Sequence, residues 1–403
     1  MKNRKAKSDV LQLLKRSCWK TYPITTPLAL EAENTCDISV IIPAYNMGDF
    51  SEYRNSLFHR CLLSVISQFC GSVDFSCEVI LVDDGSSDNT VSVMEEFRDD
   101  PRLNDVRHSV KVTIIRQKHL GVAAARNAGL RCAGGKYVAF LDADDDFFSD
   151  FYLKTLYDLT RLHQADICAG KRFIGGIGPC SYKSAYPGAS QEVTVLTKYE
   201  EFRHVSGYVT GKLIRRSLFD GTAFPERLIY EDTLTQLVLY PRCRKIVCTE
   251  HEDAVYQYNV NETGITYHKN EGNLGADAVI AALECVRSLI RLRKESDRLG
   301  KNPRVARPDI WWYHTVVNHL GTLLYHRVVH CSRKTRKYSF LLACEVADLA
   351  AEEAGISLFR PVSAADFVLY HHLYHQWVHA GQMSVISGRI RRIGLKKERK
   401  NAQ

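Results

Sequence analysis

Apolar runs of strand length alternate with segments of helical periodicity over the first third of the chain. The apolar runs are rich in β-branched residues. They span residues 38–42, 77–82, 112–115 and 137–141. The helical segments between them are 52–69, 88–98 and 119–132. This alternation predicts an α/β fold in which helices cover both faces of a mostly parallel sheet.

The pattern becomes less regular after about residue 150. The glycine-rich stretch 170–179 is typical of a loop, and we expect helices over 197–206 and 231–240. From about residue 270 onward the chain shows helical periodicity only, interrupted by the proline-containing segment 300–308. The predicted parts are a basic N-terminal extension (1–36), a main domain (37–268) and a helical C-terminal region with a basic tail (269–403).

The net charge of +8 is concentrated at the two ends of the chain. Residues 1–20 contain seven Lys and Arg against one Asp, and residues 389–403 contain seven against one Glu. Each end therefore carries +6, which leaves about −4 for the residues between them. Such ends suit an anionic membrane surface or an acidic lipid-linked acceptor, with solvated tails as the alternative. Nucleic acid is not expected as a partner, because no aromatic residues interleave a basic face.

The thirteen cysteines show neither a disulfide nor a zinc pattern. Their number is odd and none belongs to a Cys-x-x-Cys pair, so we expect reduced thiols. No apolar run approaches the roughly 18 residues of a membrane-spanning helix. The basic N-terminus lacks a signal-peptide core, since Lys15 and Arg16 follow Leu14 at once. These features predict a cytoplasmic location, peripheral on the cytosolic face of a membrane if the basic ends bind there.

Polar residues follow the predicted strands, at the edge of the sheet where ligands bind in α/β proteins. The first strand leads into Tyr45, whose ring suits a flat base, and the second leads into Asp83 and Asp84. The third leads into a helix of small residues, 121–127, which lets its backbone approach a ligand and offers Arg126 as a cation. These ends are the candidate binding positions.

Four carboxylates follow the fourth strand within five residues, at Asp142, Asp144, Asp145 and Asp146. Carboxylates at this density raise one another's pKa values unless a cation neutralises them. A hard divalent ion, Mn²⁺ or Mg²⁺, prefers oxygen ligands and completes its shell with substrate phosphates. We therefore predict a metal site, with a solvated acidic turn as the alternative. An EF-hand calcium loop is excluded, because Phe147 stands where that loop needs glycine.

The spacing of these motifs resembles that of the family-2 glycosyltransferases, which have the GT-A fold. The matching segments are 43–46 (Pro-Ala-Tyr-Asn), 82–86 (Val-Asp-Asp-Gly-Ser), 121–127, 142–144 (Asp-Ala-Asp) and 231–232 (Glu-Asp). The resemblance covers about residues 37–268. It implies a nucleotide-binding half (37–146) and a half for the acceptor and catalysis (147–268).

The resemblance also implies a role for each motif. Tyr45 and Asp84 should hold the base of a nucleotide-sugar donor, and Asp142 the ribose side. Asp144 should bind the metal ion on the diphosphate. The residues expected to contact the donor are Pro43, Tyr45, Asp84, Arg126, Asp142 and Lys212.

The expected mechanism is direct displacement with inversion at the anomeric carbon. A divalent cation on Asp144, helped by Arg126 and Lys212, would stabilise the diphosphate as it leaves. Asp232, next to Glu231, looks like the family's general base, which takes the proton of the acceptor hydroxyl. Without the upstream motifs, this pair would be more typical of acidic residues at a helix N-terminus.

Two positions depart from the family's pattern. Members often have an Arg after the paired tyrosines and a Ser before Ile-Thr, where this chain has Asn259 and Gly264. The grip on the diphosphate would then rest more on His268 or Lys269. His268 is also a candidate metal ligand, although a lone His is more often a packed or surface side chain.

A histidine stripe lies in the C-terminal region. His371, His375 and His379 share one helix face by their spacing. A metal site is one interpretation. Packing against another helix is favoured, because no acidic or cysteine ligand lies in the run. We expect the C-terminal helices to serve as an acceptor platform, a homo-oligomer contact or a membrane-facing surface.

Two other functional classes compete with a transferase. A dinucleotide-dependent oxidoreductase needs a glycine fingerprint after the first strand, and no glycine precedes Gly48 there. A catalytically inactive sugar-nucleotide-binding or scaffold protein of the same fold is the second, which intact Asp142, Asp144 and Asp232 argue against. We therefore predict a metal-dependent hexosyltransferase with a UDP-sugar donor and a glycan or lipid-linked acceptor, UDP being favoured by resemblance alone.

Overall fold

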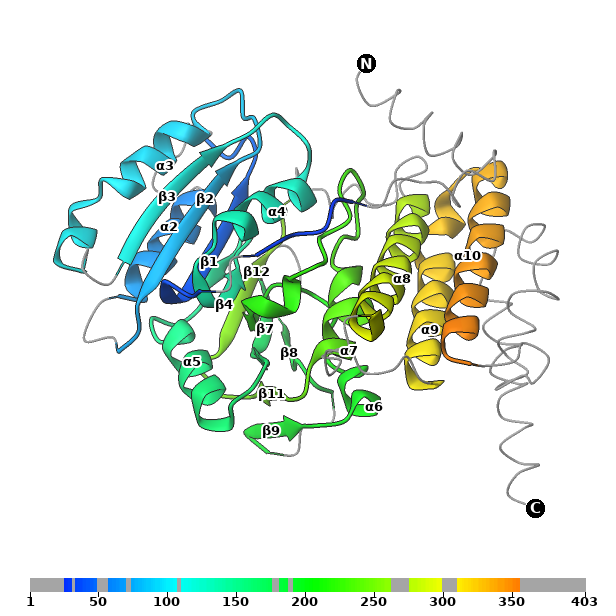
Figure 1. Ribbon diagram of the computed structural model, residues 1–403. Helices are drawn as coiled ribbons and strands as arrows, with labels where there is room; N and C mark the ends of the chain where they lie inside the picture. Colours follow the sequence, from blue (N-terminus) through cyan, green and yellow to red (C-terminus); the bar gives the residue numbers. More distant parts are fainter. Residues whose placement is uncertain are drawn as a thin grey trace. The chain divides into compact units, whose positions relative to one another are not determined.

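The computed structural model divides the chain into two compact units (Figure 1). The sheet unit comprises Thr25–Arg227 and Arg242–Glu262, and the helical unit comprises Met1–Ile24, Leu228–Pro241 and Thr263–Gln403. The structure describes residues 25–30, 33–48, 57–69, 74–106, 110–175, 181–187, 191–261, 275–298 and 310–355.

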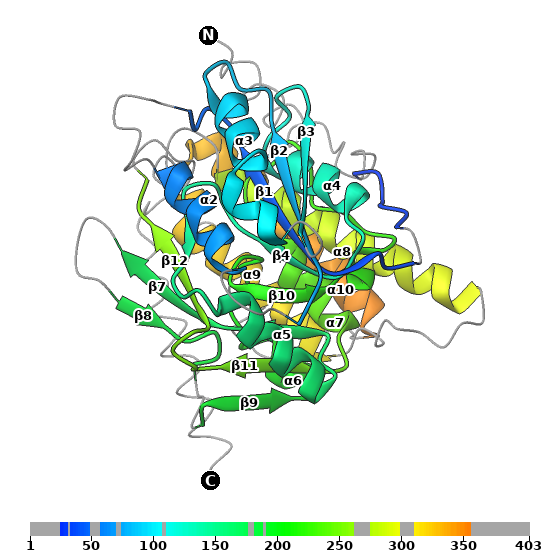
Figure 2. The same cartoon turned by 90° about the vertical axis from the view of Figure 1, so that its left-hand side faces the viewer.

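The sheet unit begins with four parallel strands in the order β3-β2-β1-β4 (Figures 1 and 2). These strands are β1 (Cys36–Ala44), β2 (Cys77–Asp83), β3 (Val110–Arg116) and β4 (Gly135–Phe140). The helices between them are α2 (Leu57–Ser67), α3 (Thr90–Arg98) and α4 (Val122–Cys132), with a 3₁₀ turn, η2 (Pro101–Val106). The strand and helix pattern predicted for this part is confirmed.

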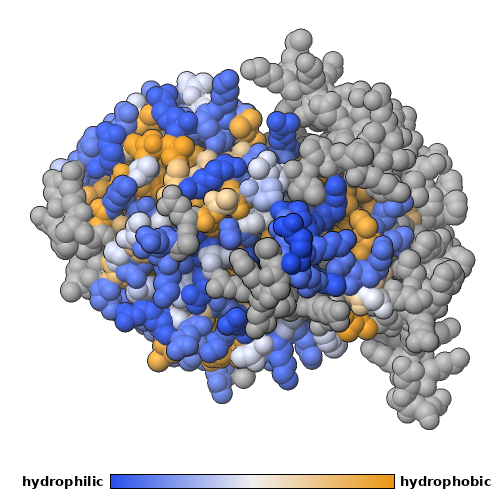
Figure 3. All heavy atoms as spheres, viewed as in Figure 1, coloured by the Kyte–Doolittle hydropathy of each residue, from blue (hydrophilic) through white to orange (hydrophobic). Residues whose placement is uncertain are grey.

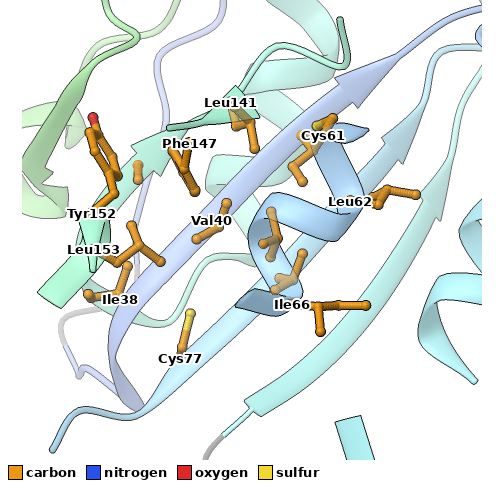
Figure 4. Close-up of a cluster of buried hydrophobic side chains, with 14 of the residues drawn as sticks. Ile38, Val40, Cys61, Leu62, Ile66, Cys77, Leu141, Phe147, Tyr152 and Leu153 are labelled. Carbon is orange, nitrogen blue, oxygen red and sulfur yellow. The ribbon is translucent and has the colours of Figure 1, made fainter. Parts of the chain in front are cut away.

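Helices lie on both faces of this sheet because alternate strand residues face opposite ways. Ile38, Val40 and Ile42 of β1 belong to one core cluster with α2, α3 and α5 (Tyr152–His163). Figure 4 shows side chains of β1, α2 and α5 gathered in this core. Ile41 faces the other way, toward α4, where a Cβ on Gly129 would lie 2.5 Å from its Cγ2 atom. Glycine at that position lets α4 pack closely on the sheet.

The remaining strands make the sheet mixed. The full order is β3-β2-β1-β4-β10-β6-β11-β9, with β10 antiparallel to both of its neighbours. The added strands are β6 (Ile167–Ala169), β9 (Val193–Leu196), β10 (Lys212–Arg215) and β11 (Ile246–Thr249). Two short helices, α6 (Tyr199–Phe202) and η3 (Arg216–Phe219), complete this part, so the helix expected over 197–206 is present in shortened form.

A second sheet includes residues 171–175, which are part of the loop predicted over 170–179. Its order is β5-β12-β7-β8. The strands are β5 (Asp146–Phe147), β7 (Lys171–Gly175), β8 (Ser181–Lys183) and β12 (Val255–Asn259). The loop prediction is wrong for residues 171–175, because β12 supplies a parallel partner from far along the chain. Glycine at position 170 lets this segment pack closely against the backbone of Ala254, since a Cβ there would lie 2.2 Å from the Ala254 carbonyl oxygen.

The helical unit contains the helices predicted after residue 270. They are α8 (Gly275–Arg298), α9 (Ile310–His326), η5 (Val328–His330) and α10 (Arg333–Glu353). The helix expected over 231–240 appears as a π-helical segment, η4 (Thr235–Leu239), followed by α7 (Tyr240–Arg242). The fully buried Trp312 indole of α9 donates its N–H to the Leu237 carbonyl at 3.1 Å. Contacts of this kind group residues 228–241 with the helices, whereas the predicted boundaries placed them in the main domain.

The described surface is largely hydrophilic on the face shown in Figure 3, with scattered apolar patches. Among the described residues, no helix is both long enough and apolar enough to cross a membrane. The nine cysteines whose side chains the structure describes are free thiols, as the sequence predicts.

Candidate functional site

The predicted polar clusters meet at one edge of the main sheet. In the parallel register, Ala44 at the end of β1 pairs with Asp83 at the end of β2. β4 ends at Phe140, next to Ile41 of β1, and the acidic motif follows. β10 runs antiparallel to β4, which brings its first residue, Lys212, to this edge as well. The fold thus assembles residues that lie far apart in the sequence.

An aromatic pair stands at the end of β1. The Tyr45 ring is 43% exposed and stacks on the His119 ring, with centroids 3.9 Å apart and planes 18° apart. A flat and accessible ring of this kind can stack with a base. His119, in the loop between β3 and α4, has no counterpart among the residues predicted from the sequence.

Asp84 fixes the loop that carries His119. Its carboxylate is 2% exposed and accepts the backbone N–H groups of Leu120 and Gly121 at 2.9 and 2.8 Å. It also accepts the Gln117 side-chain amide at 2.6 Å and lies 2.8 Å from His119 Nδ1. Asp84 therefore fixes the position of His119 in the aromatic pair. Its contact with a base stays a prediction.

Arg126 and Asp142 form an ion pair at this edge. The Arg126 Nη2 atom lies 2.6 Å from Asp142 Oδ1, and the buried Arg126 guanidinium lies 6.0 and 5.7 Å from the Phe140 and Phe224 ring centroids. The Asp142 side chain remains 31% exposed. A buried charge-assisted hydrogen bond holds a carboxylate in one orientation. The buried guanidinium thus orients the exposed face of Asp142, whereas the sequence suggested a direct contact of Arg126 with the donor.

The acidic motif divides into two structural and two accessible carboxylates. Asp145 is fully buried and accepts the Tyr256 hydroxyl at 2.7 Å and the Asn259 backbone N–H at 2.8 Å. Asp146 accepts from Arg60 at 2.8 Å and from the Asn259 side-chain amide at 2.9 Å. Burial, followed by the charges of neighbouring carboxylates, raises the pKa of Asp145 well above its usual value. These two aspartates anchor β12, so they do not need a metal ion as a partner.

Asp144 forms no ion pair within the described parts of the chain. It is partly exposed, and its Oδ2 accepts the Asn261 side-chain amide at 3.0 Å. Burial and the nearby Asp142 charge raise its pKa. A cation would relieve both effects by favouring the charged form. Asp144 is therefore a partly exposed carboxylate whose charged form a cation would favour.

Asn259 explains one departure from the family's pattern. Its side-chain amide donates to the Asp144 carbonyl at 3.0 Å and to Asp146 at 2.9 Å, in addition to the backbone bond to Asp145. It is a buried hub that fixes the acidic motif on β12. Its role is structural, and the other departure, Gly264, lies outside the described residues together with His268 and Lys269.

Lys212 is buried at the start of β10. Its side chain is 2% exposed, and its Nζ donates to the Tyr208 carbonyl at 2.5 Å. Tyr208 belongs to the segment that leads into β10 and is 53% exposed. The structure thus brings Lys212 to the expected edge of the sheet, with its ammonium held by the backbone.

Glu231 and Asp232 belong to the helical unit. They form the turn that precedes η4, with the Thr235 N–H donating to the Asp232 carbonyl at 2.9 Å. The hydroxyl of the next residue, Thr233, lies 3.1 Å from the Nε2 atom of His319 in α9. Asp277 of α8 accepts the backbone N–H of Ile229. The acidic pair is therefore held by two of the C-terminal helices.

Among the described residues, no group of three His, Cys, Asp or Glu side chains is arranged to hold a metal ion. Two partly exposed carboxylates, Asp142 and Asp144, remain. Such a pair suits an ion that takes its other ligands from substrate phosphates and water. The residues present thus fit Mn²⁺ or Mg²⁺ bound together with a diphosphate. The predicted ligand His268 and the histidines at 371, 375 and 379 lie outside the described residues.

Several residues of this edge escaped the sequence patterns. His119, Arg60 and Asn261 each act through a contact with a residue distant in the chain, and nothing in their local sequence marks them. Arg172 lies in β7, the strand that was predicted as a loop.

Parts of this chain are similar in sequence to known proteins. Glycosyltransferase GlyA of Streptococcus pneumoniae is 27% identical over 241 residues, 57% of this chain and 31% of that protein. The uncharacterized glycosyltransferase YibD of Escherichia coli is 35% identical over 119 residues, 30% of this chain and 29% of that protein. The matches thus span about a third of the length of these two relatives. A TarS fragment of S. aureus, solved with UDP-GlcNAc, has 20% identity and a TM-score of 0.48, covering 79% of this chain and 90% of that one.

The family model named Glycosyl transferase family 2 matches residues 39–221. The match includes the aromatic pair, the acidic motif and Lys212, and it ends before Asp232. It confirms the resemblance that the motifs indicated. Residues 39–221 thus match glycosyl transferase family 2, and the mixed sheet flanked by helices agrees with the GT-A fold that the resemblance implies.

Proposed function

We propose that the chain transfers a sugar from a UDP-sugar to a hydroxyl of a glycan or lipid-linked acceptor, with inversion at the anomeric carbon. The observation that carries the proposal is the division of the acidic motif. Asp145 and Asp146 form hydrogen bonds with residues of β12. Asp142 and Asp144 stay partly exposed at the edge where α/β sheets bind ligands. This difference between the two pairs supports a role in ligand binding for the two partly exposed carboxylates.

The donor site follows from the order of residues along the edge. The exposed Tyr45 ring, backed by His119, offers a stacking surface for the base. Asp142, oriented by Arg126, would accept hydrogen bonds from ribose hydroxyls. The preference for UDP among nucleotides rests on the family resemblance.

A divalent cation, Mn²⁺ or Mg²⁺, would be held by Asp144 with Asp142 beside it. When bound, such an ion acts as a Lewis acid on the diphosphate leaving group. Asn261 orients the Asp144 carboxylate through its amide. Asn259 fixes the backbone of the motif, so that the two accessible carboxylates keep their positions.

Asp232 is the proposed general base. Its carboxylate would take the proton of the acceptor hydroxyl while the oxygen attacks the anomeric carbon from the face opposite the diphosphate, which is the origin of inversion. The partly exposed Asp232 side chain lies in a turn that Thr233 ties to α9. A fixed turn suits a group that must meet its substrate in one geometry.

A thermal-shift panel tests this proposal. The purified chain would be melted with UDP, GDP, dTDP and CMP sugars, each with Mn²⁺ and with Mn²⁺ plus a chelator. We expect one nucleotide sugar to raise the melting temperature, with the shift lost on chelation, since a ligand at about 100 times its Kd stabilises by about 2.7 kcal/mol. The absence of any metal-dependent shift across the panel would contradict the assignment.

The Asp232→Asn variant separates binding from transfer. We expect it to show the same metal-dependent shift as the wild type and to lose transfer by a factor of about 10²–10⁴, the range of general-base catalysis. Transfer is measured as release of the nucleoside diphosphate in the presence of acceptor. Full turnover by this variant would rule out Asp232 as the base.

A further inference from the structure

Arg172 occupies a cage of three tyrosines beside the acidic motif. It lies in β7, in register with Tyr256 of β12. Its guanidinium carbon is 4.2 Å from the Tyr208 ring centroid, 5.0 Å from that of Tyr256 and 5.1 Å from that of Tyr258. Aromatic faces hold a cation through their negative quadrupoles.

The edge of this guanidinium is largely unused. Its Nη2 donates to the Thr210 hydroxyl at 2.6 Å. Within the described parts of the chain, no carboxylate forms an ion pair with it. A guanidinium has five N–H donors in a planar fork that matches the oxygens of a phosphate or carboxylate. Most of that fork is therefore available to a ligand.

The charge on Arg172 is retained. Burial would lower the pKa of its guanidinium, but Tyr256 and Asp145, with further neighbours, outweigh burial and the pKa is raised. Partial burial of a charge that no carboxylate contacts directly, among the described residues, is unfavourable. The tyrosines compensate for part of this loss, and an anionic ligand would compensate for the rest.

Two contacts place the cage at the active edge of the sheet unit. The Tyr256 hydroxyl, whose ring contacts Arg172, donates to Asp145 and accepts the Asp142 backbone N–H at 3.2 Å. Tyr208, whose ring also contacts the Arg172 guanidinium, accepts a hydrogen bond from Lys212 through its carbonyl. The cage thus lies between the acidic motif and the segment that holds Lys212.

We propose that Arg172 binds an oxyanion of a substrate, either a phosphate of the nucleotide-sugar donor or an anionic group of the acceptor. This inference rests on the transferase function proposed above. It assigns Arg172 as a specificity-determining residue, because an anionic group accepts stronger, charge-assisted hydrogen bonds from the guanidinium than a neutral group does.

The test compares Arg172→Gln with a matched control. Arg215 of β10 also contacts a tyrosine ring, Tyr137 at 5.1 Å, but it is ion-paired to Asp166 at 2.7 Å and lies toward the opposite end of β4. Arg215→Gln therefore removes a similar cation away from the site. Both variants, together with Arg172→Lys as a charge-preserving one, are first compared with the wild type by circular dichroism.

Titrations with three probes distinguish the two sources of the oxyanion. UDP and uridine are titrated calorimetrically with Mn²⁺ present, and glycerol 1-phosphate is titrated by NMR as a mimic of a phosphodiester acceptor. If the donor supplies the anion, Arg172→Gln weakens UDP about tenfold or more and leaves uridine unchanged, as expected for a lost charge-assisted hydrogen bond. If the acceptor supplies it, UDP affinity is unchanged and glycerol 1-phosphate binding is lost.

Arg172→Lys should retain part of either affinity, and Arg215→Gln should change none. The proposal is overturned if folded Arg172→Gln binds UDP and glycerol 1-phosphate as the wild type does, or if Arg215→Gln loses as much affinity. Failure of the wild type to bind UDP would contradict the proposed donor instead, and glycerol 1-phosphate would then decide the role of Arg172.

Discussion

Two adjacent aspartates of one motif have opposite roles in this structure. Asp145 accepts hydrogen bonds from Tyr256 and Asn259 on its two oxygens, while the partly exposed Asp144 accepts the Asn261 side-chain amide. Asparagine has the shape of aspartate but carries one acceptor and one donor group. The same substitution at the two positions should therefore affect different properties.

We expect Asp145→Asn to destabilise the fold by about 1–3 kcal/mol, because its amide would face a buried donor. Asp144→Asn should change stability by less than about 0.5 kcal/mol and abolish the metal-dependent part of donor binding. Denaturant unfolding and calorimetric titration of UDP with and without Mn²⁺ measure the two effects. Equal donor affinity of Asp144→Asn and the wild type in Mn²⁺ would refute the role of Asp144.

Single residues also show what sequence patterns can and cannot supply. Tyr45 and Asp142 were found because each directly follows a recognisable strand. The division between Asp144 and Asp145 could not be found, since it depends on β12, which arrives from more than a hundred residues away. Arg172 was missed for the same reason, because its tyrosine partners lie 36 or more residues along the chain.

At the scale of elements, the C-terminal helices act on the segment that carries the acidic pair. α9 reaches Thr233 through His319 and Leu237 through Trp312, and α8 reaches Ile229 through Asp277. Sequence periodicity predicted these helices but not what they hold, because helical spacing defines an apolar face and not its partner. The π-helical η4 was likewise beyond a pattern that distinguishes only helix from strand.

Asp277 makes the stability of the helical unit depend on pH. Burial raises its pKa from 3.8 to about 7, so the folded state favours the protonated form. The stabilisation is therefore complete below pH 3.8 and is lost as the pH rises to about 7, by up to about 4 kcal/mol. His319 acts in the opposite direction, since burial lowers its pKa from 6.5 to about 4 and stability is lost as the pH falls through that window.

The Asp277→Asn variant isolates the first of these two effects. Asparagine keeps an acceptor for the Ile229 N–H and cannot ionise, while His319 is unchanged. We expect the stability of the variant relative to the wild type to increase between pH 4 and pH 7, as measured by urea unfolding at several pH values. A difference that is constant with pH would show that Asp277 is not perturbed by its environment.

At the scale of the whole molecule, the positive charge lies at the two ends of the sequence and the candidate site lies between them. The candidate site lies within residues whose summed charge is close to −4, while each end of the chain carries +6. An anionic bilayer attracts basic segments by about 1 kcal/mol for each Lys or Arg near its surface, and salt screens this attraction. The basic ends would then bring the enzyme to a surface that offers a lipid-linked acceptor, without contributing to donor binding.

Removal of residues 389–403 tests this arrangement. We expect the truncated chain to partition at least about tenfold less onto vesicles of anionic phospholipid in a sedimentation assay, because a net charge of +6 is lost. Partition onto neutral phosphatidylcholine vesicles should be low for both chains, and 0.5 M salt should remove the difference between them. The metal-dependent shift in melting temperature that a UDP-sugar causes should be equal for the truncated and the full chain. Unchanged partition onto anionic vesicles would leave this tail as a solvated segment, and any attraction to the membrane would then have to come from the basic residues 1–20.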